Sequence, residues 1–235
     1  DPKTADSGMA VLPAGALKIG SNSFTNTNNG PMLQFARFSI DVTEVTVEDY
    51  TQCVTAGGCS QPRRVNQNCN YGSGRNRHPM NCVTWKEAQA YCSWAGKRLP
   101  TEEEWEYAAR AGTNLLWSGA ERVEDLCQYA NVPDQAADRA GLGRQFIPCD
   151  DGVGLETADV AHYRPNAFGL YDMSGNVWEW TGDWMGPYPK EKTTNPRGTE
   201  KGDERVMRGG SWSGNLHGLH VSHRDGYPPD LRGGA

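Results

Sequence analysis

The chain has 235 residues, a net charge of −6 at pH 7 and 37% hydrophobic residues. This length suits one large domain or two small ones, and either could bury a core. The 28 glycines, the 14 prolines and a mean hydropathy of −0.71 favour an irregular, loop-rich globule over a helical bundle. The acidic balance disfavours nucleic acid as a partner. No run of about 18 apolar residues occurs, so no membrane span is predicted.

The chain is predicted to hold a short lead-in followed by one domain. Residues 1–8 are expected to be disordered, and the domain covers residues 9–235. Residues 10–20 predict a pair of strands bent at residues 13–15, and residues 34–42 predict a further strand. No internal repeat or low-complexity linker divides the rest.

Three helices are predicted from capping boxes, in which a threonine is followed three residues later by an acidic residue. The boxes are Thr46 with Asp49, Thr84 with Glu87, and Thr101 with Glu104. Gly96 and Gly112 follow the second and third helices as natural C-terminal glycines. From Gly119 onward the sequence predicts mostly turns, with short strands near residues 177–180 and 205–208.

Seven cysteines indicate an oxidising compartment, because none lies in a C-x-x-C zinc pattern and a reducing cytosol disfavours disulfides. We interpret six of them as three bridges that close local loops, although one free cysteine and three bridges can be chosen in about 105 ways. The bridges are Cys53–Cys59, Cys69–Cys82 and Cys127–Cys149. Cys92 is left over. The protein is therefore expected to be secreted, periplasmic or on the cell surface, with any signal peptide preceding the given chain.

Three segments carry a resemblance to a known family. They are residues 92–112 (CSWAGKRLPTEEEWEYAARAG), 161–184 (AHYRPNAFGLYDMSGNVWEWTGDW) and 205–212 (RVMRGGSW). Together they resemble the formylglycine-generating enzyme (sulfatase-modifying factor) family. The resemblance implies an α+β fold, an irregular and loop-rich variant of the C-type lectin fold. It also implies that Cys92 pairs with a cysteine found further downstream in family members; the alternative is a buried free thiol.

The resemblance also implies two structural calcium sites, since hard cations take carboxylate and carbonyl oxygens together. One site corresponds to Asp172, Gly175, Val177 and Glu179. The other corresponds to Asn131, Val132, Asp151 and Val153. The alternative for Asp172 and Asp151 is that each forms an ordinary Asx-turn.

The catalytic pattern of the family is broken. Its oxidase holds copper(I) on two cysteines that follow a Gly-Gly-Ser segment, and those positions fall on Gly214 and Leu219. Ser211 is retained, but one hydroxyl without the thiols offers no route to oxygen chemistry. We therefore expect no copper and leave enzymatic activity open, leaning against it.

Three histidines, His217, His220 and His223, follow in the same segment. Imidazoles bind copper, zinc or iron, so a divergent metal-dependent oxidase or oxygenase is an alternative function. A solvated polar surface is the simpler interpretation of the cluster.

The tail, residues 213–235, mixes Ser, Gly, Asn, His, Asp and Tyr, whose codons are reachable from asparagine codons by changing adenines. It is similar to variable proteins of diversity-generating retroelements, which display ligand-binding residues in this region. The candidate contact residues are Ser211, Trp212, Ser213, Asn215, His217, His220, His223, Asp225 and Tyr227. The expected function is a non-catalytic, calcium-stabilised extracytoplasmic module that binds a protein or glycan ligand; a structural accessory domain is a further alternative. The oligomeric state is open.

Overall fold

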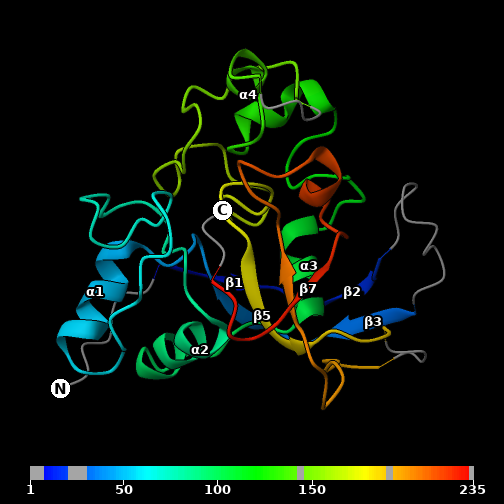
Figure 1. Cartoon of the computed structure of the whole chain (residues 1–235). Helices are drawn as coiled ribbons and strands as arrows, with labels where there is room; N and C mark the ends of the chain where they lie inside the picture. The colour runs from blue at the N-terminus through cyan, green and yellow to red at the C-terminus, as the bar shows by residue number, and fades with distance from the viewer. Residues whose placement is uncertain (1–7, 21–30, 142–145, 189–192, 233–235) are drawn as a thin grey trace.

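The computed structural model describes residues 8–20, 31–141, 146–188 and 193–232 (Figure 1). Short helices and small antiparallel sheets are joined by long loops, so the predicted α+β, loop-rich fold is confirmed. None of the described helices is long and apolar enough to cross a bilayer.

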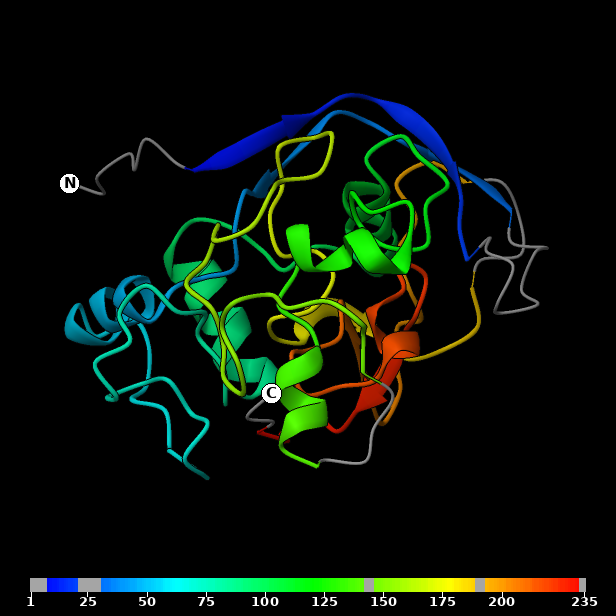
Figure 2. The same cartoon turned by 90° about the horizontal axis from the view of Figure 1, so that it is seen from above.

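The N-terminal strands form one long antiparallel ribbon. The strands are β1 (Met9–Leu12), β2 (Gly15–Lys18), β3 (Met32–Phe35) and β4 (Phe38–Asp41). The prediction of a strand pair within residues 10–20 is wrong in its pairing, because β1 pairs with β4 and β2 pairs with β3. The break at Pro13 is matched by a break at residues 36–37, which also splits the predicted strand 34–42. Figure 2 shows the ribbon arching over the rest of the molecule.

The three predicted helices are confirmed, each with both hydrogen bonds of its capping box. They are α1 (Val47–Thr55), α2 (Trp85–Trp94) and α3 (Glu102–Arg110). Gly96 and Gly112 follow α2 and α3 with φ of 71° and 79°, the left-handed conformation that glycine adopts without cost.

The C-terminal half forms a three-stranded antiparallel sheet in the order β5-β6-β7. Its strands are β5 (Glu179–Trp184), β6 (Arg205–Arg208) and β7 (Asp225–Tyr227). β6 was predicted at these residues; β5 begins two residues later than predicted, and β7 was not predicted. The loops also carry the 3-10 turns η1 (Val123–Gln128) and η2 (Leu216–Leu219) and the short helix α4 (Gln135–Arg139).

Helix α3 lies at the centre of the fold. Its Trp105 is completely buried and packs with Leu12 and Leu33 of the ribbon and with Leu170 and Val221 from the later loops. One helix thereby joins the N-terminal ribbon to the segments that carry the candidate site.

All three predicted disulfides are present. They join Cys53 to Cys59, Cys69 to Cys82, and Cys127 to Cys149. Cys92 is unpaired and half-buried, and burial, with a smaller contribution from Asp41, raises the pKa of its thiol to about 11. The thiol therefore stays protonated and poorly nucleophilic at neutral pH.

Candidate functional site

A buried ion-pair network supports the segment that contains the candidate contact residues. The Glu106 carboxylate of α3 forms ion pairs with Arg208 of β6, at an N–O distance of 2.5 Å, and with Arg110, at 2.9 Å. All three side chains are buried. Arg208 also donates to the backbone carbonyl of His223. Arg224 pairs with Glu102 at 2.5 Å. The charged residues of α3 thus hold residues 205–224 in one arrangement.

The first predicted calcium site contains carboxyl groups that form no ion pair with another described residue. Asp172 has φ of 57° and is 1% exposed. Its Oδ2 accepts the N–H of Ala161 at 3.0 Å, while its Oδ1 has no hydrogen-bond partner within the described part of the chain. Glu179 Oε2 accepts the indole N–H of Trp105 at 2.9 Å. Burial raises the pKa of Asp172 to about 6 and that of Glu179 to about 7.

Glu44 is a third carboxyl group at this site, and sequence reasoning missed it. Its Oε1 accepts the amide N–H of Asn176 at 3.0 Å, and its Oε2 is buried with no hydrogen-bond partner among the residues that the structure describes. Burial, followed by the charges of Asp172 and Glu179, raises its pKa well above the usual range. Because Glu44 follows β4 and is far away in the chain, no local pattern could have indicated it.

The second predicted calcium site is more fully hydrogen-bonded. Asp151 accepts the backbone N–H groups of Val132 at 2.9 Å and Val153 at 3.0 Å, and the second bond is that of an Asx-turn. Asn131 is completely buried, and no described residue hydrogen-bonds its Oδ1. Of these two side chains, therefore, only Asn131 has a buried oxygen that is free to bind a cation.

The structure brings the two predicted calcium sites into contact. The carbonyl oxygen of Asn131 accepts the N–H of Asn176 at 2.8 Å. At Gly175, where φ is 106°, an added Cβ would lie 2.2 Å from that same oxygen, so only glycine permits the approach. No described group of three or more His, Cys, Asp or Glu side chains is arranged to hold a metal, so any ion here would depend on carbonyl oxygens as well.

The three histidines of the tail are neighbours in space. The ring centroids of His217 and His220 are 5.1 Å apart, and those of His217 and His223 are 4.7 Å apart. Trp117 packs against His220 and Trp178 against His223, at 5.5 Å and 5.9 Å. Burial, followed by the other histidines, lowers the pKa of His220 to about 4; His223 has the same shift, with burial again the main cause.

These pKa values predict an acid-sensitive contribution to stability. A histidine whose pKa is about 4 in the folded protein and about 6.5 in the unfolded chain stabilises the fold above pH 6.5, and this stabilisation is lost progressively as the pH falls from about 6.5 to about 4. Urea unfolding at pH 7 and pH 5 is expected to show a smaller loss of stability on acidification in His220→Gln than in the parent protein. Equal losses of stability in the two proteins would contradict the lowered pKa of His220.

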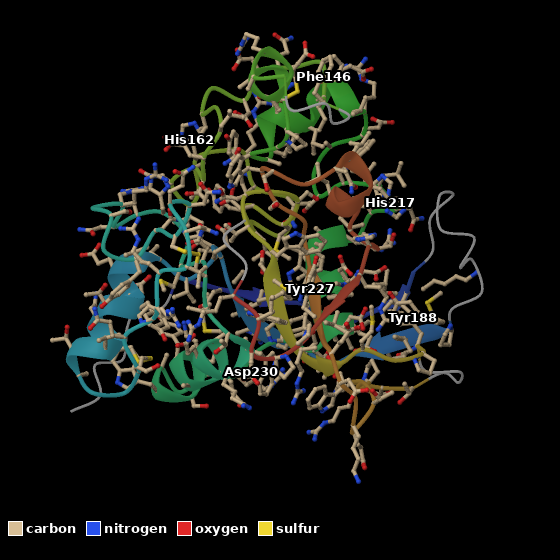
Figure 3. All side chains as sticks on the ribbon, viewed as in Figure 1. Phe146, His162, Tyr188, His217, Tyr227 and Asp230 are labelled. Atoms are coloured by element: carbon tan, nitrogen blue, oxygen red, sulfur yellow. A yellow bond between two sulfur atoms is a disulfide. The ribbon has the colours of Figure 1, made fainter. Side chains whose placement is uncertain are left out.

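The predicted contact residues fall into two groups. Ser211, Trp212 and His220 are 1%, 7% and 2% exposed, so their assignment to a contact surface is corrected. They are buried because this segment packs against other loops: the backbone N–H of Trp212 donates to the carbonyl of Asn176, and the ring of His220 packs against Trp117. The others are exposed or half-buried: Ser213, Asn215, His217, His223, Asp225 and Tyr227. Figure 3 labels His217 near η2 and Tyr227 on β7.

The positions that would carry the catalytic thiols lie in the same segment. Gly214 follows a buried Ser211, and Leu219 is completely buried. Neither residue can ligate a soft metal or form a disulfide with a substrate.

A largely apolar cavity of 470 Å³ lies beside the carboxyl groups and was not predicted. Its walls include Tyr50, Tyr91, Trp178 and the unpaired Cys92, and Glu44 also lines it. These residues come from separate helices and loops, so only the tertiary structure assembles the cavity.

Comparison with known proteins shows the family to which this chain belongs. The sequence matches the sulfatase-modifying factor enzyme 1-like domain over residues 1–234. It is 44% identical over 145 residues to the formylglycine-generating enzyme of Streptomyces coelicolor, covering 60% of this chain and 44% of that protein. The chain spans less than half the length of the formylglycine-generating enzymes it matches.

Two solved structures resemble nearly the whole chain. Treponema denticola variable protein 1 has a TM-score of 0.76 and 25% identity, covering 96% of this chain and 91% of that one. PvdO from Pseudomonas aeruginosa has a TM-score of 0.74 and 27% identity, covering 96% of this chain and 90% of that one. With the match over residues 1–234, these similarities show that the chain belongs to the sulfatase-modifying factor enzyme 1-like domain family.

Proposed function

We propose that this chain is a non-catalytic, extracytoplasmic binding module. Its contact face consists of Ser213, Asn215, His217, His223, Asp225 and Tyr227, together with Trp178. The observation that carries the proposal is the rigid support under this face, where Arg208 holds the carbonyl of His223. The three disulfides support a location outside the cytosol.

The composition of the face suits recognition. Aromatic and imidazole rings offer large contact areas with few rotatable bonds, and Ser and Asn offer adaptable hydrogen bonds. Treponema denticola variable protein 1 shares the fold, with a TM-score of 0.76. We therefore extend the proposal to a protein or glycan ligand. An origin by retroelement diversification further requires a reverse transcriptase gene and a template copy of the tail near the gene.

The face can be tested with a glycan array and an array of purified surface proteins. The expected result is that a spot bound by the parent protein is lost in the variant His217→Ala/His223→Ala/Tyr227→Ala. The control Arg122→Ala/Gln128→Ala, on η1 and its preceding residue, should bind like the parent. Equal binding by all three proteins would contradict the proposed face.

Catalysis has its own test. A cysteine-containing peptide incubated with the purified protein, copper and oxygen is expected to yield no aldehyde, because Gly214 and Leu219 replace the thiols. Aldehyde formation would overturn the non-catalytic assignment.

The histidine cluster supports a second candidate, a divergent metal-dependent oxidase. The observation that favours this candidate is the contact of the His217 ring with the rings of both His220 and His223. Copper or iron bound in proportion to protein, and lost in His217→Ala/His220→Ala, would favour this candidate. Calcium alone would favour the binding module. If neither ligand nor transition metal binds, a structural accessory domain remains.

We also propose that calcium is structural and binds at Asp172, Glu179 and the carbonyl oxygens of Gly175 and Val177. The unpartnered Asp172 Oδ1 and the neighbouring Glu44 support this assignment, because a divalent ion would offset buried negative charge. The site at Asn131, Val132, Asp151 and Val153 is the weaker part of the proposal, since Asp151 already accepts two N–H groups.

Removing calcium is expected to lower the melting temperature. An ion present at 100 times its dissociation constant stabilises a fold by about 2.7 kcal/mol. Asp172→Asn should abolish this dependence, and in chelator it should leave stability unchanged or raised, because it removes a buried carboxyl that lacks a basic partner. Thermal unfolding in calcium and in chelator checks both effects. A calcium response that survives in Asp172→Asn would contradict the site.

A further inference from the structure

A cavity of 620 Å³ with both polar and apolar wall residues lies between α2, the start of β4 and the loop that precedes β6. Four arginines line it: Arg37, Arg98, Arg197 and Arg205. We call it the arginine cavity. None of its wall residues belongs to the contact face, and in Figure 1 α2 lies at the lower edge of the molecule while the tail segment around η2 lies above α3.

The carboxylates in the wall are already engaged. Glu104 receives both terminal nitrogens of Arg98, each at 2.7 Å. Asp183 receives the backbone N–H groups of Glu102 at 2.6 Å and Gly198 at 2.8 Å.

The four arginines of the wall outnumber its two carboxylates, Glu104 and Asp183, and this leaves a surplus of positive charge. Arg37, Arg197 and Arg205 form no ion pair within the described ranges. In a protein of net charge −6, this makes the cavity a local concentration of the opposite sign.

Arg205 is held rigidly. Its guanidinium lies between the rings of Trp85 and Trp184, 3.7 Å and 3.6 Å from their centroids. Its Nη1 donates to the carbonyl of Gly182 at 2.6 Å, and no acceptor for Nη2 is found among the described residues. Because the two rings cover the faces of the guanidinium, a ligand would meet its edge, where the N–H groups lie.

The other walls suit a hydrophilic ligand. Gln89 and Ser93 project from α2, and Thr101 and Asn195 come from the adjoining loops. Amides and hydroxyls hydrogen-bond hydroxyl groups, while arginine forks bind carboxylate, sulfate and phosphate groups. The volume lies within the range of small-molecule sites.

We propose that the arginine cavity binds a small, hydroxyl-bearing molecule that carries two or more oxyanion groups. The oxyanion groups could be carboxylates or sulfate esters, and probes of each kind distinguish the two. This site does not depend on the proposed function of the tail.

Isothermal titration at low salt uses three probes: citrate, sucrose octasulfate and uncharged sucrose. If only citrate binds, the ligand carries carboxylates. If only sucrose octasulfate binds, the ligand carries sulfate esters. Sucrose is expected not to bind. Arg37→Gln/Arg197→Gln changes two exposed side chains and should weaken binding at least tenfold. The matched control Arg63→Gln/Arg64→Gln removes the same charge from an exposed loop elsewhere and should change affinity less than twofold.

Three outcomes would overturn the proposal. If both double variants weaken binding equally, the effect is due to net charge and not to the cavity. If sucrose binds as well as the anions, charge is not required for binding. If neither anion binds, the cavity is not an anion site. Arg205→Lys keeps the charge but not the planar fork, and it should also weaken binding tenfold. The contact-face variant His217→Ala/His223→Ala/Tyr227→Ala should bind the anion like the parent protein, so the two proposals can fail separately.

Discussion

Replacing Arg208 with alanine is expected to lower the free energy of unfolding by about 3–5 kcal/mol, the range observed when one partner of a buried ion pair is removed. Arg208 is completely buried, and Glu106, also buried, would lose its partner from β6. The bond from Arg208 to the carbonyl of His223 would be lost as well. The change therefore leaves a buried carboxylate less compensated and releases the support of the tail.

Urea denaturation of Arg208→Ala at neutral pH measures this effect. The control is Lys86→Ala, which breaks the pair between Lys86 and Asp230, whose side chains are 69% and 75% exposed. Such surface pairs contribute about 0–1 kcal/mol. A loss below about 1 kcal/mol in Arg208→Ala would show that the network is dispensable for the fold. If Arg208→Ala does not fold, Glu106→Gln tests the same pair with a smaller change in shape.

Removing the bridge between Cys127 and Cys149 is expected to cost about 3 kcal/mol, because it closes a loop of sequence separation 22. This loop contains α4 as well as Asn131 and Val132 of the second proposed calcium site. Without the bridge, the unfolded chain gains conformational freedom, and the two halves of that site lose their covalent link.

The double variant Cys127→Ser/Cys149→Ser is compared by thermal and urea unfolding with Cys53→Ser/Cys59→Ser. The second bridge has a separation of only 6, so its loss should be less costly. Cys92→Ser changes an unpaired thiol and serves as the control. The loop-closure explanation would be contradicted if the bridge of separation 6 proved to be the more stabilising one.

Local features of the fold could be predicted from the sequence. A capping box is made of four consecutive residues, so Thr46, Thr84 and Thr101 could be assigned as helix starts without knowledge of the rest of the chain. The three disulfides join cysteines close in sequence, and their loops could be recognised from composition. The absence of cysteine at Gly214 and Leu219 is likewise a property of the sequence.

Pairing between strands could not be predicted in the same way. The proline between β1 and β2 indicated a bend, but a bend is compatible with either a hairpin or a continuous ribbon. The choice depends on the partners β3 and β4, which lie beyond residues 21–30 of the chain. β7 has only three residues and depends on pairing with β6, so it has too little local signal to be recognised.

The sequence by itself determined the family, the helix starts, the local disulfides and the absence of cysteine at Gly214 and Leu219, because each depends on residue identity at short spacing. The tertiary structure alone decided that Glu44 approaches Asp172, that Ser211, Trp212 and His220 are buried, and that arginines from four segments surround one cavity. Those outcomes depend on how the elements pack around α3. Packing follows from contacts between distant segments, for which a single chain carries no periodic or local pattern.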